Sequence, residues 1–218
     1  MIQDAAAIAR RNRSYPGDFG MHQIAWLPDG EAYIHTLHPA IKSSRMSYTV
    51  IGCGEFYDAA EKPLMCPWLG KDKSTNKVVV GNPDAKTGIS SRVDVAKFVV
   101  ATLRHPEISE NRILGFHSDH ISHREMAHIL ENNIGKPVKL NMISMQEMQD
   151  ILKNPPSAPQ EGQHGNTFPG NFLMTVRYLQ GHGMFWRPSG MLHNDLFPEV
   201  KTVCFNEYMK NLTSDRDK

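Results

Sequence analysis

The sequence has few cysteines and almost no net charge, and each shortage excludes a class of protein. The three cysteines in 218 residues are Cys53, Cys66 and Cys204, and no two of them form a Cys-x-x-Cys pair. A disulfide-stapled secreted domain or a cysteine-based zinc site would need more cysteines at closer spacing, so free thiols in a reducing compartment fit better. A formal net charge of +1 argues against non-specific nucleic-acid binding, which requires a basic surface.

Long apolar runs are also missing. No stretch approaches the length of a membrane span, and the N-terminal segment "MIQDAAAIARRNRSYPGDFG" lacks the apolar centre of a signal peptide. With 40% hydrophobic and 22% charged residues, the chain has the composition of an ordinary globular protein. Its length allows one domain, or one domain and a lobe. We therefore expect a cytoplasmic protein that binds neither membranes nor nucleic acid.

A complete glycine fingerprint for a dinucleotide is not present either. Residues 47–58, "SYTVIGCGEFYD", read as a strand that runs into two glycines, whereas the fingerprint is Gly-x-Gly-x-x-Gly between a strand and a helix. Tyr57 stands at the third glycine position, where its side chain would block close helix packing. Pro63 and Pro67 interrupt the following segment, so no long helix is expected there. We predict no phosphate loop and no bound cofactor for this segment.

Strands alternate with helices along the chain, which predicts an α/β fold. Local end signals are clearest around one helix, where Ser122 and Glu125 form a capping box and Gly135 with Pro137 supplies the stop. A second helix opens at Ser144. We predict helices over 2–11, 31–45, 90–106 (closed by Pro106), 121–138, 144–153 and 170–181. We predict strands over 46–52, 77–81 and 111–118, and a short strand that ends in a loop over 13–20. A polar turn is expected over 82–88 and a flexible loop over 154–171.

Several segments occur in an order typical of one family. They are "YPGDFG", "SYTVIGCGEFYD", "VDVAKFVVATLRHP" with the following "NRILGFHSDHISHREMAHILENNIGKPV", and "NDLFPEVKTVCFNEYM". Together they resemble the NmrA-like and isoflavone-reductase-like family of atypical short-chain dehydrogenases. The resemblance implies a partial Rossmann-like parallel sheet that lacks the N-terminal dinucleotide-binding strands, followed by a small α/β substrate lobe. It further implies one N-terminally truncated NmrA-like domain over 1–218, with the sheet remnant in 1–60 and the lobe in 61–218.

The chain departs from the family where hydride transfer would be carried out. Family reductases have a glycine-rich loop on an earlier strand and a lysine upstream of the Tyr-Thr pair; at that lysine's position this chain has Ile34, flanked by Tyr33 and His35. None of the tyrosines begins a Tyr-x-x-x-Lys pair. We therefore expect a non-redox isomerase or cyclase that acts on a hydrophobic secondary metabolite. Two alternatives stay open: an NAD(P)H-dependent reductase completed by a missing or partner nucleotide-binding half, and a non-catalytic NmrA-type regulator.

The resemblance places the loops after "PGDFG" and "GCGEFYD" at the carboxyl ends of neighbouring strands, where open α/β sheets bind ligands. Carboxylates there could transfer protons if partly buried, and an imidazole titrates near neutral pH. The expected catalytic residues are Asp18, His35, Glu55 and Tyr57. The expected substrate-binding residues are Phe19, Phe56, Met174, Tyr178, Met184 and Trp186. For each aromatic residue, ordinary core packing is the competing explanation, and the simpler explanation of His35 is an exposed or core histidine.

Three further expectations concern metals, thiols and assembly. His117, Asp119, His120 and His123 match no standard zinc spacing, so no metal site is predicted. Cys53 is expected to be a small buried thiol and not a nucleophile. A sheet without its first strands would expose an edge at the "TVIG" strand, which predicts a homodimer as the remedy.

Overall fold

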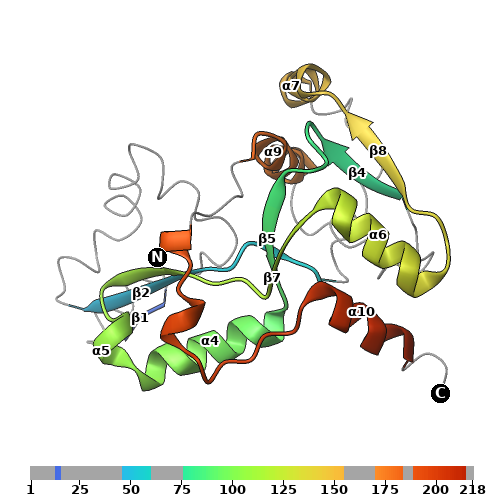
Figure 1. The fold of residues 1–218 in the computed structure, drawn as a ribbon. Helices are drawn as coiled ribbons and strands as arrows, with labels where there is room; N and C mark the ends of the chain where they lie inside the picture. Colours follow the sequence, from blue (N-terminus) through green and yellow to red (C-terminus); the bar gives the residue numbers. More distant parts are fainter. Residues whose placement is uncertain (1–12, 16–45, 60–75, 155–169, 184–188, 215–218) are drawn as a thin grey trace. The chain divides into compact units, whose positions relative to one another are not determined.

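The computed structural model describes residues 13–15, 46–59, 76–154, 170–183 and 189–214, which Figure 1 draws in colour. The chain divides into two compact units. The first unit comprises 1–54, 93–117 and 188–201, and the second comprises 55–92, 118–187 and 202–218. The chain therefore passes between units several times, and the predicted boundary at 60/61 stays a prediction. No helix within the described ranges is long and apolar enough to cross a bilayer.

The first unit is built on a parallel sheet. Its strands are β1 (Arg13–Ser14), β2 (Ser47–Gly52) and β6 (Arg112–Gly115), in the order β1-β2-β6. β2 is buried along most of its length, as its apolar, β-branched sequence predicts. β2 lies between β1 and β6, but β1 pairs only with Ser47 and Tyr48, so the open edge expected at residues 49–52 stays a prediction on the β1 side.

Helix α4 (Arg92–Arg104) supplies the core of the first unit. Phe98 on this helix stacks on Phe116 with ring centroids 4.0 Å apart, and Phe197 meets Phe116 edge-on at 5.6 Å. Offset-stacked and edge-on rings are the favoured aromatic arrangements. The predicted stop is confirmed: α4 ends at Arg104, and Pro106 opens the short α5 (Pro106–Ser109).

The second unit contains two small sheets. In one, β3 (Glu55–Phe56) and β5 (Lys86–Ser90) are parallel, and β7 (Asp119–Ser122) pairs with β5 in the antiparallel sense. The predicted turn over 82–88 is wrong from Lys86 onward, since β5 begins there. β7 occupies residues that were expected to be only a helix entry. β5 and β7 are both short, and their polar sequences lack the alternation that marks a half-buried strand.

The other sheet of the second unit pairs β4 (Asn76–Val80) with β8 (Lys139–Ile143) in parallel. β4 follows the predicted strand closely. The sequence analysis did not predict β8, because the polar–apolar alternation in "KLNMI" extends only from Lys139 to Met142 and is too short to stand out. The register sets Val80 opposite Ile143.

Most predicted helices of the described residues are confirmed, with shifted ends. The helices of the second unit are α6 (His123–Ile134), α7 (Met145–Lys153), α9 (Gly170–Gly181) and α10 (Phe205–Ser214). The first unit also contains two short 3₁₀ helices, η4 (Ser189–Met191) and η5 (Asn194–Leu196). The predicted loop over 154–171 lies outside the described residues except at its ends, since α9 already begins at Gly170.

Both predicted bonds of the capping box at α6 are present. The Glu125 N–H donates to Ser122 Oγ at 3.1 Å, and the Ser122 N–H donates to Glu125 Oε2 at 2.7 Å. Gly135 ends the helix in the left-handed conformation, with φ 67°. The Lys86 ammonium, followed by the Ser122 backbone, holds the pKa of Glu125 below its ordinary value. The stabilisation from Glu125 is therefore present above the ordinary carboxyl pKa and is lost as pH falls through the lowered one.

We expect Ser122→Ala to lower the free energy of unfolding by about 1 kcal/mol, because it removes the acceptor of one helix N–H. Ser144→Ala at α7 is the matched control, since Ser144 Oγ accepts the Glu147 N–H at 3.1 Å. Urea denaturation followed by circular dichroism measures both. If Ser122→Ala is neutral while Ser144→Ala is destabilising, the capping box does not contribute as described.

Candidate functional site

The first unit offers the carboxyl ends of two neighbouring parallel strands. β2 and β6 end side by side, with Gly52 opposite Gly115. Gly54, just beyond β2, has φ 77°, a conformation that glycine adopts without strain. The Phe116 N–H donates to the Gly52 carbonyl at 2.7 Å and extends the pairing past the strand ends. This is the position at which open parallel sheets bind ligands.

A segment from far along the chain borders these strand ends. His193 Nδ1 accepts the Gly115 N–H at 3.0 Å, so a neutral His193 carries its proton on Nε2. Asn194 bonds both backbone groups of His117: Oδ1 accepts the N–H at 3.2 Å, and Nδ2 donates to the carbonyl at 2.8 Å. These bonds fix the loop after β6. Sequence reasoning missed His193 and Asn194, because side chains that bond a distant backbone leave no periodic signal.

The second unit contains a buried polar cluster, which we call the Glu55 cluster, formed by Glu55, Arg177 and Gln180. Arg177 Nη1 lies 3.2 Å from Glu55 Oε2 and 2.7 Å from Gln180 Oε1. Gln180 Nε2 donates to the same Glu55 oxygen at 2.6 Å. The Arg177 side chain is 0% exposed and that of Glu55 is 6% exposed. The cluster therefore ties β3 to α9 through charge-assisted hydrogen bonds.

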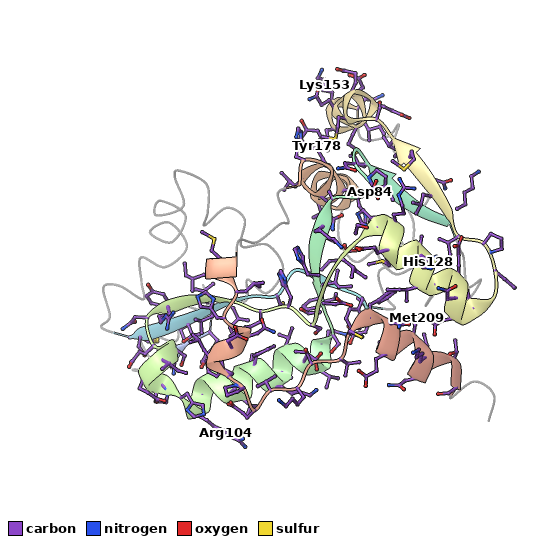
Figure 2. All side chains as sticks on the ribbon, viewed as in Figure 1. Asp84, Arg104, His128, Lys153, Tyr178 and Met209 are labelled. Atoms are coloured by element: carbon purple, nitrogen blue, oxygen red, sulfur yellow. The ribbon has the colours of Figure 1, made fainter. Side chains whose placement is uncertain are left out.

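The carboxyl end of α9 packs closely against the end of β4. A Cβ added at Gly181 would lie 2.5 Å from the Val80 carbonyl oxygen, so no other residue fits without a backbone shift. This contact and the Glu55 cluster hold α9 at two points. Between them Tyr178 is half-buried; its hydroxyl accepts from Gln149 Nε2 at 3.0 Å, and its ring meets His182 edge-on at 4.6 Å (Figure 2). Tyr178 therefore presents a partly accessible aromatic ring on a fixed helix.

Tyr57 lies in a buried aromatic group. Its hydroxyl donates to the Val203 carbonyl at 2.6 Å, and its ring contacts Phe205 and Tyr208 with centroid distances of 5.7 and 4.9 Å. The residue is 1% exposed. These contacts join the loop after β3 to the start of α10. Proton transfer by Tyr57 stays a prediction; the contacts themselves are those of a packed core tyrosine.

The structure brings together part of the predicted site. Glu55, Phe56 and Tyr57 follow one another at β3, Phe56 is half-buried, and Arg177 and Gln180 join them, which the sequence did not indicate. The roles of the other predicted residues are untested, because the residues or their side chains lie outside the described part of the chain: Asp18, Phe19, His35, Met174, Met184 and Trp186. Cys53 is a buried free thiol, as expected. No three His, Cys, Asp or Glu side chains among the described residues gather to hold a metal ion.

The described residues do not fit the pyrophosphate of a nicotinamide dinucleotide. Directly after Gly54 the chain enters β3 and a turn, so no helix begins within residues 55–59, and the rest of the segment in which no long helix was expected lies outside the described residues. At the strand-to-helix turn between β5 and α4, the Arg92 N–H donates to Asp58 Oδ2 at 2.9 Å. A carboxylate in this place opposes a phosphate. We therefore assign no hydride transfer to these residues.

Comparison with known proteins confirms the predicted resemblance to the NmrA-like, isoflavone-reductase-like family, whose α/β fold the chain has. No family model matches the chain. In sequence it is 24% identical over 179 residues to the probable pinoresinol-lariciresinol reductase 3 of Arabidopsis thaliana, covering 79% of this chain and 55% of that protein. The chain thus spans little more than half the length of this relative.

Several solved structures share the fold, and the titles of some of them name reductases. The structure of AtPrR2 with NADP+ and (+)pinoresinol matches with a TM-score of 0.71 at 18% identity, covering 96% of this chain and 68% of that one. A ternary complex of leucoanthocyanidin reductase from Vitis vinifera matches with a TM-score of 0.68 at 14% identity, and the match covers 98% of this chain and 73% of that one. An isoflavone reductase matches with a TM-score of 0.66 at 16% identity, and the match covers 94% of this chain and 66% of that one.

Proposed function

We propose that this chain is the substrate-binding portion of an NADPH-dependent reductase that acts on a hydrophobic, aromatic secondary metabolite. The observation that carries the proposal is the fold itself. Almost the whole chain follows the fold of a reductase that was solved with NADP+ and (+)pinoresinol. This supports the reductase alternative over the cofactor-independent isomerase or cyclase that the missing lysine suggested.

The nucleotide would be held by polypeptide outside the described residues, either in a longer form of the protein or in a partner chain. The described strand ends supply no pyrophosphate cradle, whereas two of the solved relatives are leucoanthocyanidin reductases with bound NADPH. This chain's contribution would be to bind and orient the substrate. Orientation of a reacting group is itself a large part of enzymatic rate enhancement.

Within the second unit, the Glu55 cluster and the Gly181 contact support this role. They fix α9 and therefore the ring of Tyr178, a predicted substrate-binding residue. A rigid aromatic side chain with one polar end suits a flat phenolic ligand. Tyr178→Leu should weaken ligand binding by about five-fold, since aromatic contacts contribute on the order of 1 kcal/mol each. Tyr178→Phe keeps the ring and is the matched control.

The test uses the purified 218-residue chain with (+)pinoresinol as the probe, because that ligand occupies a protein of the same fold. We expect binding in isothermal titration without nucleotide, and no oxidation of NADPH by this chain alone. Adding a nucleotide-binding half, as a longer gene product or in trans, should give NADPH oxidation that depends on the probe or on a related phenolic compound.

Two other results would replace the proposal. Conversion of the probe with no nicotinamide present would support the isomerase or cyclase alternative. Tight dinucleotide binding without conversion, together with co-purification of a transcription factor, would support the regulator. Failure to bind any of a panel of lignans, flavonoids and related phenolics would contradict a substrate-binding role.

A further inference from the structure

Strand β8 has an edge that the described residues leave open. It pairs with β4 alone in the part of the chain that the structure describes. The Ile143 carbonyl accepts the Gly81 N–H at 3.0 Å, so the backbone groups of Ile143 face β4. Successive residues of a strand alternate in direction. The N–H and C=O groups of Leu140 and Met142 therefore point away from β4.

An apolar groove runs beside this edge. It has a volume of about 530 Å³ and lies between β8 and helix α6. Its lining includes Leu140 and Met142 from β8, with Ala127 from α6. The Met142 side chain is 49% exposed. An open strand edge next to exposed apolar side chains is a template for strand pairing unless charge, proline or a covering element blocks it.

The two ends of the groove carry opposite charges. At one end, Glu131 Oε1 accepts the Val138 N–H at 2.9 Å, which places this carboxylate at the start of β8. At the other end is Arg124, which contacts Asp84 at 2.7 Å; both side chains are exposed, so this pair binds weakly. His128 lies between them on α6 (Figure 2). Arg124 and Glu131 are two helical turns apart and therefore share one face of α6.

We propose that a second copy of this chain docks here, with β8 of each copy paired antiparallel about a two-fold axis at Asn141. This register sets Leu140 opposite Met142 of the second copy, and both residues direct their backbone groups outward. Such a pair exchanges both N–H···O bonds. The two side chains then lie on one face and pack across the strands. Asn141 faces its own equivalent in the non-hydrogen-bonded position.

A two-fold axis at Asn141 also brings the opposite charges at the two ends of the groove together. Helix α6 runs back along β8: Glu131 bonds Val138 at the start of the strand, while the Arg124 N–H donates to the Pro83 carbonyl, two residues beyond the Gly81 that bonds Ile143 at its end. A two-fold rotation at Asn141 exchanges these ends, so Arg124 of each copy approaches Glu131 of the other. One surface thus complements itself in strand length, apolar pairing and charge, as an isologous dimer requires. These residues are separate from those that support the proposed function.

Sedimentation velocity of the 218-residue chain over a range of concentrations tests the proposal. We expect a dimer in the wild type. Met142→Pro removes an N–H that points outward and leaves the bonds to β4 intact, and proline is tolerated on edge strands. It should weaken association by at least about ten-fold. Met142→Lys, which sets an ammonium opposite Leu140, should do the same.

Leu103→Lys is the matched control, because Leu103 is 55% exposed on α4 and does not line this groove; it should leave association unchanged. Arg124→Glu should weaken the dimer, and the further change Glu131→Arg should restore part of it. Hydrogen exchange gives a second readout: the amides of Leu140 and Met142 should become protected as concentration rises, while the Asn141 amide is protected throughout. This readout decides the matter if the proline variant does not fold.

A wild-type chain that stays monomeric at roughly 100 μM would overturn the proposal, because the dissociation constant would then lie well above that concentration. A dimer that tolerates both Met142 variants, or Leu140 and Met142 amides that exchange freely in the dimer, would overturn it as well. In the last two cases the chain associates through another surface.

Discussion

Replacing Arg177 by methionine should lower the free energy of unfolding by about 3–5 kcal/mol, because the change removes one partner of a buried ion pair. The Glu55 carboxylate would stay in the interior without the guanidinium that now lies 3.2 Å away. Methionine has a similar length, so little cavity volume is added and the electrostatic loss dominates. Guanidinium chloride denaturation followed by circular dichroism measures the change.

Two further variants separate the ion pair from general damage to α9. The double variant Glu55→Leu with Arg177→Met should be more stable than Arg177→Met alone, because it removes both buried charges. Lys153→Met is the matched control: Lys153 and Asp150 are 74% and 63% exposed, and exposed pairs contribute about 0–1 kcal/mol. If Arg177→Met costs no more than Lys153→Met, the Glu55 cluster does not stabilise the fold as described.

Most helices of the described residues were predictable because their signals are local, although α5 and α10 were not predicted. Ser122 with Glu125, Ser144, and Pro106 each act within a few residues of the helix end that they mark. The strands β5, β7 and β8 were not predictable from such signals. Their residues form strands because partners far away in sequence supply the ladder, as when Ile89 of β5 pairs with Asp119 of β7. Single-sequence patterns carry no information about such partners.

The residues of the candidate site likewise divide into one that local sequence signals indicated and two that they did not. Glu55 could be singled out because it follows a strand and two glycines, a local pattern that predicts a ligand loop. Arg177 and Gln180 could not, since they sit 122 and 125 residues farther along on a helix that reads as an ordinary apolar packing helix. The one available hint was an arginine inside the apolar run "FLMTVRYLQ". A long polar side chain in that setting needs a buried partner, but the sequence does not name it.

Phe116→Ala should destabilise the first unit by about 3–5 kcal/mol, the usual cost of truncating a fully buried phenylalanine. Phe116 is 0% exposed and stacks on Phe98, so alanine would leave a cavity that the parallel strands around it cannot close without moving. Phe116→Leu keeps most of the volume and should cost clearly less. Leu196→Ala, at a residue that is 38% exposed, serves as the surface control.

The location of this loss also tests the division into two units. All of these contacts lie in the first unit, and chains with separate compact units need not unfold in one step. Native-state hydrogen exchange of Phe116→Ala should therefore show reduced protection in β2 and β6, with smaller changes in α6 and α7 of the second unit. An equal loss of protection in all four elements would show that the two units unfold as one cooperative structure, and a loss no larger than that of Leu196→Ala would contradict the central role of Phe116.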